Sequence, residues 1–146
     1  MATVASILDQ KGHNVYWVPP QTSILDALRL MDEKKIGAVL VMEKGEVLGI
    51  FSERDYARRG VLMGNSESTA VKEVMTEKVY YVEPDQSAEA CLAQMSDKHI
   101  RHLPVVKNGT VIGVVSIGDV VTSLLKDKET LIKGLENFIL DEEIKL

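Results

Sequence analysis

The chain has 146 residues, a length that suits one ordinary domain or two small half-domains sharing a core. It is 45% hydrophobic and 27% charged, as globular proteins are, and its net charge of −5 disfavours nucleic acids and anionic membranes as partners. The single cysteine, Cys91, excludes an internal disulfide and suits a reducing compartment. Neither a signal peptide nor an apolar run of about 20 residues is visible, so we expect a cytoplasmic protein.

The first half of the chain alternates between the periodicities of strands and helices. Serines that suit helix N-caps, an apolar hairpin pattern and a polar linker divide it into elements. In chain order we predict a short helix over 3–9, a strand over 15–18, a helix capped by Ser23 and ending near Lys34, strands over 38–42 and 47–51 about Lys44-Gly45, a helix from Ser52 to near Gly60, and a linker over 60–69.

This order recurs in the second half of the chain, without a gap, at a constant offset of 64 residues. The match begins at Val79, which corresponds to Val15, and it continues through Ser123. Such a long ungapped match indicates an internal duplication. The repeated unit is strand–helix–strand–strand–helix, which predicts a small mixed sheet covered by helices. Identical pairs include Pro20/Pro84, Ser23/Ser87, Leu28/Leu92, Met31/Met95, Gly49/Gly113, Ser52/Ser116 and Asp55/Asp119.

Each repeat ends in a Ser-x-x-Asp motif where a strand turns into a helix. Ser52 and Asp55 form the first copy, and Ser116 and Asp119 form the second. The simplest interpretation is a capping box, in which the two side chains bond to the backbone of the first helical turn. The alternative is a ligand site, because free N–H groups at a helix start bind anions and a carboxylate there can accept ribose hydroxyls. Duplication of the motif favours the second interpretation.

An apolar stripe continues after the second repeat towards the C-terminus, with helical spacing. Gly134 is its weak point, at a cost of about 1 kcal/mol relative to alanine. The stripe has to pack either on its own module or on a partner, and the sequence leaves both possibilities open. Its members are Val120, Val121, Leu124, Leu125, Leu131, Ile132, Leu135, Phe138 and Ile139.

Two repeats that each end in Gly-h-h-Ser-x-x-Asp (h, apolar) resemble the cystathionine-β-synthase (CBS) domain family. The stretch Ile100-Arg101-His102-Leu103-Pro104-Val105-Val106 is also typical of that family, and the resemblance covers residues 3 to about 124. It implies an α/β fold of two pseudo-twofold-related β-α-β-β-α repeats packed sheet to sheet. The repeats would span 3–62 and 70–125, with a C-terminal helical extension over 126–146.

The resemblance also implies a regulatory, non-catalytic function. CBS pairs bind adenosine-containing ligands such as AMP, ADP, ATP, NAD(H) or S-adenosylmethionine in two clefts, and they often form homodimers. With no effector domain attached, the signal would pass to a separate protein. For the Asp119 cleft the resemblance implies Tyr16, Ile36, Gly37, Ala38, Val114 and Ser116; for the Asp55 cleft it implies Ile50, Ser52, Arg54, Arg58, Tyr80, Ile100, Arg101 and His102.

The two clefts are expected to differ in charge. Arg101 and His102 stand where the first repeat has Gly37 and Ala38, so we expect less positive charge around Asp119 than around Asp55. Two other classes of function compete with ligand sensing. One is a structural dimerisation module with vestigial clefts. The other is a small enzyme. The sequence argues against it, because we find no P-loop, no group of residues with the spacing of metal ligands, and no nucleophile with a supporting base.

Overall fold

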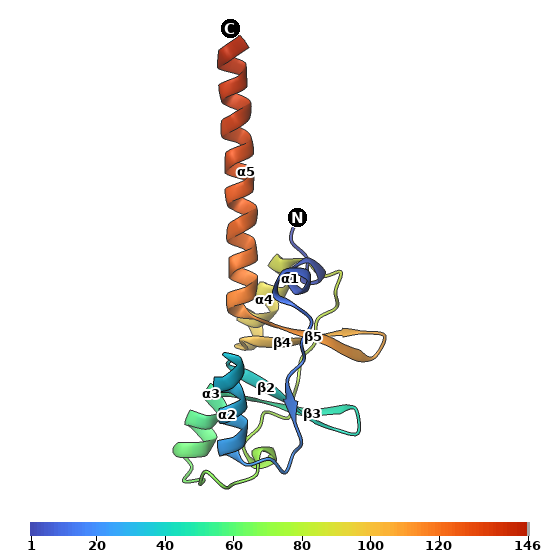
Figure 1. The fold of residues 1–146 in the computed structure, drawn as a ribbon, viewed down its shortest axis with the longest axis vertical. Coiled ribbons are helices and arrows are strands. Elements are labelled where there is room, and N and C mark those ends of the chain that lie inside the picture. The colour runs from blue at the N-terminus through green and yellow to red at the C-terminus, as the bar shows by residue number, and fades with distance from the viewer. Residues whose placement is uncertain (146) are drawn as a thin grey trace. The chain divides into compact units, whose positions relative to one another are not determined.

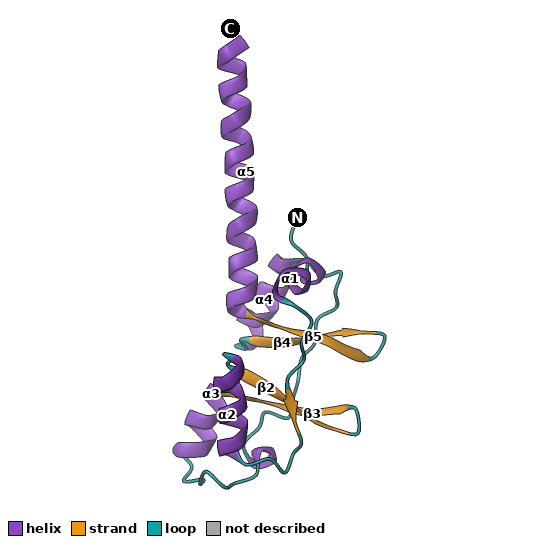
Figure 2. Cartoon of the chain, viewed as in Figure 1, coloured by secondary structure: helices purple, strands orange, loops and turns teal. Residues whose placement is uncertain are grey.

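The structure, a computed structural model, describes residues 1–145, and for residue 138 and residues 140–145 it describes the backbone alone. The chain divides into two compact units. We call residues 15–80 the first-repeat unit, and residues 1–14 together with those from Tyr81 onward the second-repeat unit. Each unit combines helices with a small sheet, which confirms the predicted α/β class (Figure 2).

The first-repeat unit is built on a three-stranded sheet in the order β1-β2-β3. β1 pairs with β2 in parallel and β2 pairs with β3 antiparallel. The hairpin turns at Lys44 and Gly45, both at positive φ (53° and 79°), as a two-residue hairpin turn requires. Its elements are β1 (Trp17–Val18), α2 (Ile24–Lys34), β2 (Ala38–Glu43), β3 (Glu46–Ser52), α3 (Glu53–Asp55), the π-helix η1 (Tyr56–Val61) and the 3-10 helix η2 (Val71–Glu73).

The second-repeat unit is built on the antiparallel hairpin of β4 and β5. Its turn, Asn108-Gly109, is also at positive φ (52° and 77°), as a two-residue hairpin turn requires. Its elements are α1 (Val4–Lys11), α4 (Ala88–Lys98), β4 (His102–Lys107), β5 (Thr110–Ser116) and α5 (Ile117–Lys145) (Figure 1).

The predicted repeats and the compact units do not coincide, because the short helix that opens each repeat packs in the unit of the other repeat. α1 lies in the stretch 3–62 predicted as the first repeat but packs in the second-repeat unit, where Leu8 lies against Gly113. η2 lies in the stretch 70–125 predicted as the second repeat but packs in the first-repeat unit, where Met75 lies against Gly49. Glycine is needed at both strand positions, since an added Cβ would come within 2.6 Å of Leu8 or Met75. The two segments therefore fill equivalent places.

Two predicted elements differ from what forms. The strand predicted over 15–18 is reduced to β1, and in the second repeat its counterpart is only a bridge between Val82 and Val105. Pro104 explains the difference. Its counterpart Leu40 donates its N–H to the carbonyl of Tyr16, at 3.2 Å, and a proline has no N–H with which to make the equivalent bond. The helix predicted from Ser52 to Gly60 starts as α3 but continues as a π-helix.

The buried side chains follow the predicted apolar faces. Met31 and Met95 lie on the inner faces of α2 and α4, with 2% and 1% exposure. Cys91 is completely buried beside Met95 on α4, as a small core residue would be. Trp17 on β1 and its repeat counterpart Tyr81 are about half-exposed.

α5 is one continuous helix that begins beside α4 and β5 and then projects away from the other elements of its unit (Figure 1). Val120 near its start is fully buried, whereas the apolar residues of its second half are more than half exposed: Leu131, Ile132, Leu135 and Ile139. The predicted helical period is confirmed as far as residue 145, while Leu146 and the side chain of Phe138 lie outside the described residues. The second half of the stripe is therefore an uncovered apolar face.

Candidate functional site

The first Ser-x-x-Asp motif holds its carboxylate in a fixed, almost buried position. Asp55 is 9% exposed, and its Oδ2 accepts the N–H of Ser52 at 2.9 Å and the Ser52 hydroxyl at 3.1 Å. In return the Ser52 Oγ accepts the Asp55 N–H at 3.2 Å, which completes a capping box. The other oxygen, Oδ1, accepts the hydroxyl of Thr76 at 2.9 Å. The carboxylate is thus held by its own helix start and by the segment after η2.

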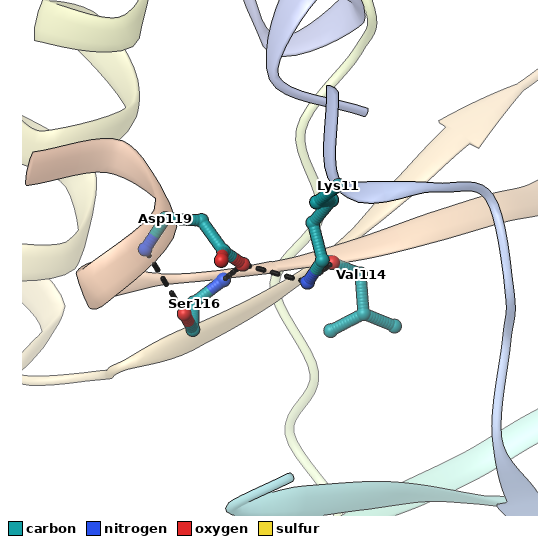
Figure 3. A network of polar contacts seen from close by, with 4 residues as sticks. All are labelled: Lys11, Val114, Ser116 and Asp119. Carbon is teal, nitrogen blue, oxygen red and sulfur yellow. Dashed lines mark hydrogen bonds and ion pairs between the residues drawn. The ribbon is translucent and has the colours of Figure 1, made fainter. Parts of the chain in front are cut away.

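The second motif repeats this arrangement around Asp119, with a different outer partner (Figure 3). Asp119 Oδ2 accepts the N–H of Ser116 at 2.8 Å, and the Ser116 Oγ accepts the Asp119 N–H at 3.1 Å. The ammonium group of Lys11, from the end of α1, donates to Oδ2 at 2.6 Å and to the Val114 carbonyl at 2.7 Å. The outer partner of Asp119 is therefore a charged donor on the oxygen that also accepts the serine N–H, whereas the outer partner of Asp55 is a neutral hydroxyl on the other oxygen.

Burial and these bonds act in opposite directions on the pKa of Asp119. Burial removes water from the carboxylate and raises its pKa, but the hydrogen bonds from Lys11 and Ser116 and the charge of Lys11 outweigh burial. The net result is a pKa below the ordinary value for aspartate. The carboxylate is ionised at neutral pH and can accept hydrogen bonds from a ligand.

Lys11 and Thr76 are the two site residues that the sequence analysis missed. They lie 108 and 21 residues from the carboxylates they contact, outside the Gly-h-h-Ser-x-x-Asp motifs. A weak signal was present, because the short segments that end near Leu8 and Met75 match each other in sequence. The match indicates that the two segments occupy equivalent places in the fold. It does not indicate which of the two sheets each segment packs against.

Three predicted residues of the first-repeat unit, Gly37, Ala38 and Ile50, lie next to residues of the first motif or its partner Thr76. The carbonyl of Gly37 accepts the N–H of Glu53 at 3.1 Å, and Ala38 pairs with Ser52 across the sheet. Ile50 lies on β3 beside Thr76, and the Tyr16 ring carries the Lys34 ammonium 5.5 Å from its centroid. The remaining predicted residues of this unit are Ile36 and Tyr80, which are half-buried, Arg54, which follows the capping serine by two residues, and Arg58, which is exposed on η1.

In the second-repeat unit, the backbone of the predicted basic residues Arg101 and His102 contacts the second motif. The Arg101 carbonyl accepts the N–H of Ile117 at 2.8 Å, and His102 pairs with Ser116 across the hairpin. The N–H of Ile100 bonds to the carbonyl of Met95 at the end of α4. Which cleft carries more positive charge stays a prediction, because each predicted cleft combines residues of both units. Within the second-repeat unit, Lys11 contacts Asp119 directly, a positive charge that the sequence analysis did not include. The physical reason is the exchange of segments, which brings α1 into this unit.

The predicted clefts combine residues of both units, so the pairing of Tyr16 and Gly37 with Asp119, and of Arg101 with Asp55, stays a prediction. Within residues 1–145, no three His, Cys, Asp or Glu side chains lie together as metal ligands would. None of the helices described is both long enough and apolar enough to cross a membrane.

Comparison with protein families identifies the duplicated unit. The family model described as the CBS domain matches twice, at residues 4–61 and 71–126, and these two segments make up most of the chain. The chain belongs to the CBS domain family. The resemblance inferred from the paired motifs is confirmed, and the chain is a pair of CBS repeats. CBS pairs are in general regulatory modules that bind ligands.

Individual relatives support the same assignment. The mitochondrial CBS domain-containing protein CBSX3 of Arabidopsis thaliana is 33% identical over 94% of this chain and 71% of its own length. A signal-transduction protein with CBS domains from Burkholderia ambifaria MC40-6 is 48% identical, with a TM-score of 0.84 over 86% of this chain and 96% of that one. The CBS domain pair of protein MJ0100, solved with 5′-methylthioadenosine and S-adenosyl-L-methionine, shares the fold at 23% identity and a TM-score of 0.75, over 88% of this chain and 98% of its own.

Proposed function

We propose that this CBS pair is a regulatory sensor of an adenosine-containing ligand, in the class of AMP, ADP, ATP, NAD(H) and S-adenosylmethionine. The observation that carries the proposal is the carboxylate that each unit holds at the start of a helix. Asp55 and Asp119 are each anchored by the N–H of the capping serine. A fixed carboxylate next to a helix N-terminus suits a ribose, whose two hydroxyls donate to it, with any phosphate near the free N–H groups.

The proposed sites extend beyond the two carboxylates. Ser52 and Ser116 offer hydroxyl and backbone donors, and the small residues Gly37 and Ala38 allow a flat base to approach the backbone. Arg101 and His102 provide donors for phosphate. The complete proposed set is Tyr16, Ile36, Gly37, Ala38, Val114, Ser116 and Asp119 for one cleft, and Ile50, Ser52, Arg54, Asp55, Arg58, Tyr80, Ile100, Arg101 and His102 for the other. MJ0100 supports the ligand class, because its CBS pair was solved with two adenosine compounds.

The output of the sensor is a change in stability or in assembly, and no catalytic step is part of the proposal. We propose a homodimer, since the exposed residues of α5 from Leu125 to Ile139 form an apolar face that a second copy can cover. A separate effector protein would read the signal. The single buried thiol, Cys91, suits the reducing environment of the cytoplasm. The competing function is a structural dimerisation module whose clefts bind nothing.

Ligand-induced stabilisation separates these two functions. A ligand at about 100 times its dissociation constant adds about 2.7 kcal/mol to the free energy of unfolding, which for this chain length raises the Tm by about 5–10 °C. The measurement is thermal unfolding with each of AMP, ADP, ATP, NAD, NADH and S-adenosylmethionine at millimolar concentration. Mass spectrometry of the natively purified protein identifies a ligand that it retains.

Variants show whether the response comes from the proposed sites. Asp55→Asn keeps the size of the side chain but lowers its capacity to accept ribose hydroxyls, so it should reduce the shift. Glu53→Gln makes the same chemical change on an exposed neighbouring residue and should leave the shift as it is. If no ligand stabilises the protein, the structural module is the better account of the chain.

A further inference from the structure

The two units complete equivalent sites with donors of different charge. Ile50 and Val114 are equivalent positions of the repeat, on β3 and β5. In the first-repeat unit, Thr76 donates its N–H to the Ile50 carbonyl at 2.8 Å and its hydroxyl to Asp55 at 2.9 Å. In the second-repeat unit, the single ammonium of Lys11 makes both contacts, to the Val114 carbonyl at 2.7 Å and to Asp119 at 2.6 Å. One site is therefore closed by neutral groups and the other by a cation.

This difference changes what happens when a ribose binds. At Asp55, a ribose hydroxyl competes with the hydroxyl of Thr76, and the exchange of one neutral donor for another leaves no charge behind. At Asp119, Lys11 and the Ser116 N–H both donate to Oδ2, so a ribose whose two hydroxyls take both carboxylate oxygens competes with the ammonium group, which loses part of its ion pair. Charge-assisted hydrogen bonds are about twice as strong as neutral ones, so an uncharged nucleoside is at a disadvantage there.

A phosphate on the ligand removes that disadvantage. The Lys11 side chain is 35% exposed and has a flexible four-carbon stem, so its ammonium can turn from the carboxylate towards an anion bound beside it. A phosphate that accepts the ammonium replaces the charge-assisted bond that the ribose displaced. Nucleotide and nucleoside are thus distinguished by a residue outside both sequence motifs.

We propose that Lys11 sets the charge selectivity of the Asp119 site, so that a nucleotide with a phosphate binds there in preference to the uncharged nucleoside. At the Asp55 site, Thr76 contacts the carboxylate with a neutral hydroxyl, so it gives no preference for a nucleotide over a nucleoside. The inference rests on the proposed function, because it assumes that a ribose binds at Asp119.

Two backbone amides report the two sites separately. The N–H of Ser116 donates to Asp119 and that of Ser52 donates to Asp55, so a ligand that binds either carboxylate changes the NMR shift of the corresponding amide. The experiment titrates the full ¹⁵N-labelled chain with AMP and, separately, with adenosine. The variants are Lys11→Met, which removes the charge and keeps the stem, and Lys11→Arg, which restores a cation. Lys107→Met is the matched control, an exposed lysine at the end of β4 in the same unit.

At the Ser116 amide we expect the native protein to bind AMP about tenfold more tightly than adenosine, the lower end of what a hydrogen bond between charged groups provides. Lys11→Met should remove most of this preference, chiefly by tightening the binding of adenosine, which no longer has to displace an ammonium group, whereas Lys11→Arg and Lys107→Met should retain it. The ratio of the dissociation constants for adenosine and AMP, measured at the Ser52 amide, should be the same in the native protein and the three variants. A purely structural role of Lys11 would weaken both ligands alike and leave the ratio at Ser116 unchanged.

The outcomes that overturn the inference differ from those that overturn the proposed function. If Lys11→Met keeps the AMP preference, or weakens AMP and adenosine equally, Lys11 does not set selectivity although the ligand site stands. If AMP moves the Ser52 amide and leaves Ser116 unaffected, the selective nucleotide site is not at Asp119. If neither ligand moves either amide, and the other adenosine compounds also fail, the proposed function is wrong and the inference falls with it.

Discussion

Replacing Gly49 by alanine tests the finding that each hairpin packs against the segment that opens the other repeat: Met75 and Thr76 against β3, and α1 against β5. A Cβ at this position would lie 2.6 Å from the Sδ of Met75, 2.9 Å from its Cγ and 2.8 Å from the Thr76 carbonyl oxygen. The methionine side chain can bend away, but the carbonyl is backbone. It accepts the N–H of Ile50 at 2.9 Å, so moving it stretches a bond that joins the segment to β3.

The equivalent change, Gly113→Ala, provides a comparison within the same molecule. There the three atoms nearest to the Cβ would all belong to the Leu8 side chain: Cδ2 at 2.6 Å, Cδ1 at 2.9 Å and Cγ at 3.3 Å. Overpacking a core costs about 1–3 kcal/mol, and the backbone contact places Gly49→Ala at the upper end of that range. We expect Gly49→Ala to lower the free energy of unfolding by about 3 kcal/mol and Gly113→Ala by about 1–2 kcal/mol.

Thermal and urea unfolding of both variants measure these costs. For a chain of this length about 1 kcal/mol corresponds to roughly 2–4 °C, so the Tm of Gly49→Ala should fall by about 6–12 °C. Gly134→Ala is the control for the substitution itself. A Cβ there meets nothing within 4 Å, and alanine in a helix interior should stabilise the protein by about 0.5–1 kcal/mol. A Gly49→Ala protein as stable as Gly113→Ala would refute the packing of Thr76 against β3.

Three further measurements follow from the described contacts. Cys91 is fully buried, and burial raises the pKa of its thiol to about 11, so near pH 8 a thiol reagent should label the native protein far more slowly than the urea-unfolded one. Because the folded pKa of Asp119 is depressed, its stabilising effect is present above the unfolded value of about 3.9 and is lost as the pH falls through the folded value. Urea unfolding between about pH 5 and pH 3 should therefore show a smaller loss of stability for Lys11→Met than for the native protein, and equal losses would contradict the ion pair. Deleting residues 128–146 removes most of the exposed apolar face but keeps Asp127, which accepts the N–H of Ala2 at 2.8 Å, so it should convert the proposed dimer to a monomer in sedimentation experiments.

Most of the local structure could be predicted from the sequence, because its causes are local. The αL residues Lys35 and His99 end α2 and α4 at the same place in each repeat, one residue after a lysine that suits a helix C-terminus. The two-residue turns Lys44-Gly45 and Asn108-Gly109 follow from backbone conformations that these residue types tolerate. The Ser-x-x-Asp capping boxes were also recognisable, since the serine and the aspartate are only three residues apart.

Where the sequence analysis was wrong, one residue or one packing contact decided the outcome. Pro104 looks acceptable in an apolar strand, yet its missing N–H leaves the second repeat with a single bridge where the first has β1. η1 adopts π-helical bonding, which the spacing of its apolar residues did not predict, and the ring of Tyr56 lies against Gly60. Both differences depend on bonding partners that the pattern of apolar residues does not specify.

The sequence by itself determined that the chain is a duplicated CBS pair and that each repeat ends in a carboxylate at the start of a helix. Only the tertiary structure decided what completes each site. α1 packs in the second-repeat unit, and the segment after η2 packs in the first-repeat unit. As a result, Lys11 contacts Asp119, 108 residues away, and Thr76 contacts Asp55, 21 residues away. Helical and strand periodicities report which face of an element is buried, but they do not report which other element buries it. The charged partner of Asp119 therefore arises from packing, and the motifs alone did not indicate it.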